Sequence, residues 1–159
     1  MIRPLFQNIL VLVRGGEGCV EAAQYATVMS KLYRSKVHAL YVVDTATIKS
    51  LALNKIFIPE ESIEYEQNME DTGHRCLEHV KEIGAKKNVS VEIVLKKGSV
   101  AEELGKYIEE HKIDALLVGM GQTPQNEMLE RSFYAMLSHI KTSIIMVKSP
   151  IIKSIYNMA

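Results

Sequence analysis

The chain has 159 residues, and its 19 lysines and arginines balance 19 aspartates and glutamates, so its formal net charge is zero. Hydrophobic residues make up 47% and charged residues 24%, a composition that indicates a folded globular domain and excludes a disordered tail protein. Neutral charge argues against non-specific binding to nucleic acid or to anionic membranes, because both require a standing positive field. No apolar run approaches the roughly 18 residues that span a bilayer.

The cysteine content favours a reducing compartment. There are two cysteines, Cys19 and Cys76, without a CxxC motif, which is too few for a disulfide scaffold. The first residues lack the long apolar core of a signal peptide. We therefore expect a cytoplasmic protein.

Apolar runs and helical periods alternate along the chain. Short runs rich in β-branched residues predict strands over 9–13, 37–43, 89–95, 113–118 and 144–147. Helical spacing of apolar residues predicts helices from residue 20 to about 33, over 60–87, from residue 100 onward and over 126–141. Ser99 and Glu102 have the spacing of a capping box at the start of the third helix. Residues 45–59 show no clean period and predict a long connection with room for a helical turn. Whether the stretch 48–58 acts as a lid or as an interface stays open.

This alternation predicts one doubly wound α/β domain with a parallel sheet and helices on both faces. In such sheets ligands bind beyond the carboxyl ends of the strands. The residues expected at that edge are 14–18, 43–44, 98–99 and 119–123. Asp44 has two interpretations there, a ribose ligand or a cap for the following turn, and the cap is favoured.

Three stretches carry a resemblance to a known family. They are residues 9–16 with the strand 38–44, residues 97–104, and residues 113–121 with 142–147. In this order the chain resembles a universal stress protein domain over residues 6–148. The resemblance implies an adenine nucleotide alpha hydrolase-like fold with strand order 3-2-1-4-5, and often a homodimer. The expected organisation is a domain over 1–148 and a C-terminal tail over 149–159.

The resemblance also implies a nucleotide motif from which this chain departs. ATP-binding members have a G-x2-G-x9-G-[S/T] motif after the fourth strand and an acidic residue after the first. Here Arg14 matches the acidic position, and Arg131 replaces the third glycine before Ser132. Gly119 matches the first glycine, whereas Gly121 falls one residue before the second. The expectation is therefore no cofactor bound in the usual ATP mode, with ATP or AMP in an altered pocket as the alternative.

The candidate residues form one altered nucleotide or anion cleft. They are Leu12, Arg14, Val42, Gly119, Gly121, Arg131 and Ser132. The glycines of residues 15–18 fit a turn better than a phosphate loop, since neither GxGxxG nor GxxxxGK[ST] occurs. His74, Cys76 and His79 fit a solvated helix face better than a metal site. No catalytic residue is predicted, and there is no GxSxG motif.

The expected partners are a second copy and other proteins. The apolar run near Ile144–Val147 would be an edge strand, and an apolar edge favours pairing with another copy unless the tail covers it. The main hypothesis is a non-enzymatic, stress-linked regulatory homodimer. The alternative is an ATP- or AMP-binding sensor, and a small hydrolase ranks last.

Overall fold

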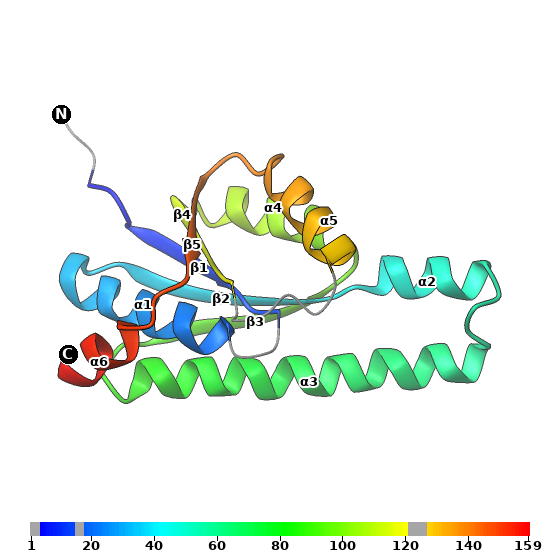
Figure 1. Cartoon of the computed structure of the whole chain (residues 1–159), viewed down its shortest axis with the longest axis horizontal. Coiled ribbons are helices and arrows are strands. Elements are labelled where there is room, and N and C mark those ends of the chain that lie inside the picture. Colours follow the sequence, from blue (N-terminus) through cyan, green and yellow to red (C-terminus); the bar gives the residue numbers. More distant parts are fainter. Residues whose placement is uncertain (1–3, 15–17, 121–126) are drawn as a thin grey trace.

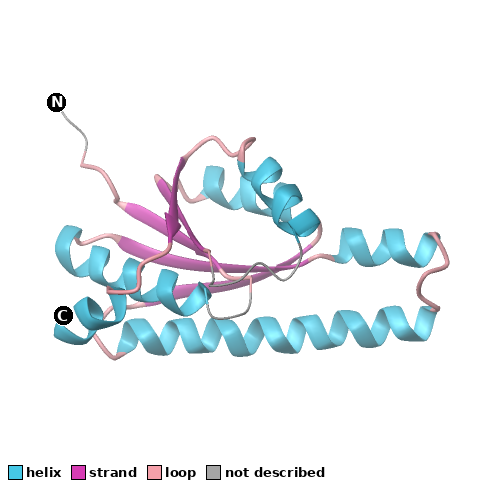
Figure 2. Ribbon diagram, viewed as in Figure 1, coloured by secondary structure: helices cyan, strands magenta, loops and turns pink. Residues whose placement is uncertain are grey.

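The five strands form one parallel sheet. The computed structural model describes residues 4–14, 18–120 and 127–159. At the centre, β1 (Asn8–Leu12) pairs with β2 (Lys36–Val43) on one side and β4 (Ala115–Gly119) on the other. Outside them lie β3 (Val91–Lys97) next to β2 and β5 (Ser143–Val147) next to β4. The order 3-2-1-4-5 confirms the predicted topology (Figures 1 and 2).

Helices cover both faces of this sheet. They are α1 (Gly18–Tyr33), α2 (Thr45–Leu53), α3 (Pro59–Ala85), α4 (Val100–Glu110), α5 (Glu127–Leu137) and α6 (Ile152–Met158). None of them, in the described parts of the chain, has the length and apolar content that crossing a membrane requires.

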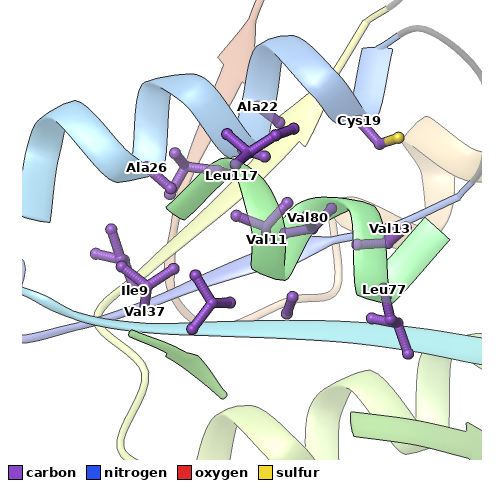
Figure 3. Close-up of a cluster of buried hydrophobic side chains, with 14 of the residues drawn as sticks. Ile9, Val11, Val13, Cys19, Ala22, Ala26, Val37, Leu77, Val80 and Leu117 are labelled. Carbon is purple, nitrogen blue, oxygen red and sulfur yellow. The ribbon is translucent and has the colours of Figure 1, made fainter. Parts of the chain in front are cut away.

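The central strand distributes its side chains to two cores, because successive residues of a strand point to opposite faces. Ile9 and Val11 pack with α1 and α3 on one face, which Figure 3 shows together with Ala22, Leu77 and other side chains. Leu10 and Leu12 pack on the other face, where α4 and α5 supply the partners. Burial on both faces explains why the strand sequence is continuously apolar.

The connection expected over residues 45–59 is in part a regular helix. Asp44 ends β2 and caps α2, since its Oδ1 accepts the backbone N–H of Thr47 at 3.0 Å and its Oδ2 accepts the Thr47 hydroxyl at 2.7 Å. This confirms the capping interpretation of Asp44. Ile48 is the one fully buried residue of α2, and a helix with a single buried residue shows no apolar period in its sequence.

The capping box expected at α4 is absent. Ser99 occupies the N-cap position, but its hydroxyl makes no capping hydrogen bond. The first turn instead carries two acidic residues, Glu102 and Glu103, whose charge suits the positive end of the helix. Glu103 is also 3.8 Å from Lys106.

The tail beyond residue 148 folds onto the helices rather than over the edge strand. Its helix α6 packs on α1, and the Tyr156 hydroxyl donates to the carbonyl of Ile83 on α3 at 2.6 Å. Lys87 donates to the carbonyl of Asn157 at 3.2 Å. Tyr156 is therefore part of the core between the sheet and α1, and the tail does not shield β5 in the way that the sequence left open.

Candidate functional site

The candidate site lies at the carboxyl edge of the sheet, where β1 and β4 end side by side. Leu12 of β1 pairs with Val118 of β4, so the residues that follow each strand emerge next to each other. The strand order reverses at β1. On one side of this strand lie β2 and β3, and on its other side lie β4 and β5. Ligands of doubly wound folds bind at such a switch point.

Arg14 leaves β1 at this edge and is held by α5. Its Nη2 atom lies 3.3 Å from Oε1 of Glu130, and its guanidinium carbon lies 3.5 Å from the centroid of the Phe133 ring. Glu130 and Phe133 are three residues apart and therefore share one face of the helix. About a third of the Arg14 side chain, 34%, remains exposed. The guanidinium therefore lies between the end of β1 and the helix that follows β4.

Gly119 has a packing reason for being glycine. A Cβ atom at this position would overlap the backbone carbonyl of Gly18, at the start of α1. The end of β4 can approach α1 this closely because residue 119 has no side chain. The next residue, Met120, accepts a hydrogen bond from the Tyr134 hydroxyl at 3.4 Å through its sulfur. This part of the edge is occupied by protein contacts.

The other predicted residues do not converge on Arg14. The side chains of Leu12 and Val42 are buried in the core beneath α4 and α5. Arg131 and Ser132 are exposed on α5, and the side chain of neither forms a hydrogen bond or ion pair with another described residue. Gly121 lies outside the described residues, as do residues 15–17 of the predicted glycine turn. Arg14 thus contacts α5 through Glu130 and Phe133, which lie close to Arg131 in the sequence, and not through Arg131 itself.

Glu130 and Phe133 are the two residues of this arrangement that the sequence analysis missed. Their signal was present: an acid and an aromatic residue three apart near the start of the helix after the fourth strand. An arginine after the first strand complements both, because a guanidinium pairs with carboxylates and stacks on aromatic rings. The pairing of Arg14 with Glu130 can be inferred only once the strand order is known, because that order brings together two residues that are 116 positions apart in the chain.

The titratable groups described near this edge include Cys19 and Asp44. Burial raises the pKa of the Cys19 thiol, near the start of α1, to about 11, so this cysteine stays protonated at neutral pH and is not a nucleophilic thiolate. Asp44 is engaged in capping α2. Across residues 4–14, 18–120 and 127–159, no group of three or more His, Cys, Asp or Glu side chains could hold a metal ion.

Comparison with known proteins identifies the family. The model of the Universal stress protein family matches residues 5–148. The chain belongs to this family. Universal stress protein YxiE of Bacillus subtilis (strain 168) is 25% identical over 146 residues, which cover 90% of this chain and 99% of YxiE.

Solved structures of family members share the fold. UspA from Lactobacillus plantarum superposes with a TM-score of 0.72 at 17% identity, covering 92% of this chain and all of that one. The universal stress protein from Archaeoglobus fulgidus in complex with dAMP has a TM-score of 0.61 at 13% identity, with 91% and 99% coverage. At these identities the likeness concerns the arrangement of strands and helices.

Proposed function

We propose that this universal stress protein is a non-enzymatic regulatory domain that acts as a homodimer and does not bind ATP in the usual mode. The observation that carries the proposal is the position of Arg14, whose guanidinium is stacked on Phe133 and paired with Glu130 at the carboxyl edge. In nucleotide-binding relatives this position is expected to hold a carboxylate, as the sequence resemblance implies.

Replacing a carboxylate by arginine inverts the hydrogen-bonding chemistry. A carboxylate accepts hydrogen bonds from ribose hydroxyls, whereas a guanidinium has five N–H donors and no acceptor. Arg14 also fills space next to α5 with a bulkier side chain. Its partners Glu130 and Phe133 would have to release it before it could contact a ligand.

An open sheet edge supports the homodimer. Within the described sheet, β5 pairs with β4 on one side only. Met146 in this strand is 39% exposed, and α6 packs on α1 rather than along β5. Unpaired backbone groups on an apolar edge strand favour pairing with a second copy. Light scattering at micromolar concentration should therefore give twice the mass of one chain, and the mass of a single chain would refute the dimer.

The alternative is a sensor that binds an adenine nucleotide in an altered pocket. It is favoured by the relative from A. fulgidus that was solved in complex with dAMP. Here Arg14, if it left Glu130, and the exposed Arg131 would bind phosphate oxygens through side-chain donors instead of backbone N–H groups.

Isothermal titration with ATP, AMP and cyclic AMP separates the two. The proposal expects no binding heat at millimolar nucleotide. Binding by the wild type that Arg14→Ala weakens, while the control Lys106→Ala does not, would establish the altered pocket instead. Release of phosphate or AMP from ATP over hours, measured on the same samples, would overturn the non-enzymatic assignment.

A further inference from the structure

Two helices project beyond the sheet as an antiparallel hairpin. Figure 1 shows α2 and the first half of α3 side by side, extending well past the strands. All fully buried residues of α3 lie between Gly73 and Gly84, in its second half. None of residues 59–72 is fully buried, although Met69 packs partly against the core and Glu66 and Glu70 reach Lys97 at the end of β3. The turns before Glu66 are therefore the part of α3 that extends furthest from the core. At 1.5 Å per residue, α3 is about 40 Å long, roughly twice what its buried half needs.

The end of this hairpin, residues 53–65, exposes a concentration of large apolar side chains. They are Leu53, Ile56, Ile58, Ile63 and Tyr65. Leu53 is 75% exposed and Ile63 is 70% exposed. Single exposed apolar residues are ordinary, but a group of five within 13 consecutive residues is typical of an interaction surface.

The turn that carries these side chains is structured. The N–H groups of Ile56 and Phe57 both donate to the carbonyl of Leu51, at 2.9 and 3.4 Å, which closes the chain after α2. The Phe57 ring lies 5.4 Å from the Tyr65 ring, so the turn is also packed against α3. An ordered apolar surface of this kind loses less conformational entropy on binding than a disordered one.

Charge decides which partner this surface suits. Residues 45–71 contain two lysines, Lys49 and Lys55, and six acidic residues. Two of the acids, Glu66 and Glu70, are paired with Lys97 at 3.4 and 2.8 Å. The other four are exposed and form no ion pair within the described residues: Glu60, Glu61, Glu64 and Asp71. Glu60 and Glu61 suit the N-terminus of α3, but that effect ends after the first turn and does not explain Glu64 or Asp71.

We propose that the end of the α2–α3 hairpin is a docking surface for a basic amphipathic helix of a protein partner. The apolar face of that helix would cover the exposed side chains of residues 53–65, and its lysines or arginines would pair with the surrounding carboxylates. A second copy of this chain would bring the same carboxylates together, and an anionic membrane would repel them. This inference rests on the proposed regulatory function, because both involve a protein partner. Docking at the hairpin does not require a bound nucleotide or pairing through the edge strand β5.

The test uses a fluorescently labelled 18-residue peptide of leucines and lysines placed at helical spacing, titrated with the full chain and followed by anisotropy. A peptide with glutamate in place of every lysine is the charge control. The proposal expects the basic peptide to bind, the acidic peptide not to bind, and affinity to fall as salt is raised, because exposed charges are screened.

Matched variants locate the binding surface. The double variant Leu53→Ser and Ile56→Ser should weaken binding at least about tenfold, which corresponds to roughly 1.4 kcal/mol. The control Leu32→Ser and Ile151→Ser alters two equally exposed aliphatic residues away from the hairpin and should leave binding unchanged. A second pair compares two triple glutamate-to-glutamine variants: Glu60, Glu61 and Glu64 against Glu102, Glu109 and Glu110. The first triple variant should weaken binding several-fold and the second should not.

Several results would overturn the proposal. These are no binding of the basic peptide up to about 1 mM, equal binding of the acidic peptide, and equal effects of the hairpin and control variants. Self-association that the Leu53→Ser and Ile56→Ser double variant abolishes would show that a second copy occupies this surface. Circular dichroism of each variant identifies any loss of fold. Nucleotide titration and the mass of the wild type test the proposed function independently.

Discussion

The contact of Arg14 with α5 can be measured by double-mutant cycles. A partly exposed ion pair such as that with Glu130 is worth about 0.2–1 kcal/mol. A guanidinium stacked on an aromatic ring at a partly exposed site adds about 0.5–1 kcal/mol. Arg14→Ala should therefore lower the free energy of unfolding by about 0.7–2 kcal/mol if the two contributions add.

Urea unfolding of the single and double variants separates the two contributions. Glu130→Gln keeps the size of the side chain and removes its charge, and Phe133→Leu keeps apolar volume and removes the ring. Coupling of Arg14 to Glu130 should fade in 1 M salt, where the Debye length is about 3 Å, while coupling to Phe133 should persist largely unchanged. The pair of Lys106 and Glu103 serves as the control and should show weaker coupling, because its two charges are 3.8 Å apart and its lysine is 65% exposed.

A coupling energy below about 0.2 kcal/mol for both partners would refute the description of Arg14 as held by α5. The main structural argument against the usual nucleotide mode would then fail with it, because a free Arg14 side chain could move away from the carboxyl edge of the sheet.

Four further predictions concern stability, and urea unfolding measures each of them. Gly119→Ala should destabilise the protein by about 2 kcal/mol or more, since its methyl group would overlap the backbone of Gly18 and force β4 and α1 apart; unchanged stability would contradict that packing. Gly105→Ala should stabilise by up to about 1 kcal/mol, because nothing lies within 4 Å and alanine favours the helix. Gly84→Ala should instead destabilise the protein, because the new Cβ would lie 2.6 Å from Cγ2 of Val91 and 2.8 Å from the carbonyl oxygen of Val89. Equal effects of Gly84→Ala and Gly105→Ala would contradict this. Burial lowers the pKa of His38 from its ordinary 6.5, so the unfolded chain binds the proton more readily. The contribution of His38 to the free energy of unfolding should be constant above about pH 6.5 and should fall below that pH by at most about 1.4 kcal/mol per pH unit. His38→Gln should flatten that slope.

The elements of the fold were largely predictable because each has a short-range signal. Continuous apolar runs identified all five strands to within a few residues. The helical spacing of apolar residues over 60–87 identified the long helix α3, in which Leu77 and Val80 are buried. Where the signal was weak the prediction was incomplete: α2 has one buried residue, and α6 is a seven-residue helix whose position depends on the Tyr156 hydrogen bond to α3.

The candidate site was predictable in place but not in its contacts. Arg14 does lie at the carboxyl edge near α5, as the strand order implies. Its partners are nevertheless Glu130 and Phe133 rather than a ligand cleft shared with Arg131. On a helix, a shift of one residue turns a side chain by about 100°, so sequence position alone does not show which of several neighbours faces the strand.

The sequence by itself determined the alternation of strands and helices and the two-sided burial of the sheet, and it predicted a departure from the family's nucleotide motif. Each of these depends on the spacing or identity of residues close together in the chain. The tertiary structure decided which side chains contact Arg14 and why residue 119 must be glycine. It also decided that the hairpin of α2 and α3 extends beyond the core. These features depend on distances between segments up to 116 residues apart, which only the packing of helices on the finished sheet brings into contact.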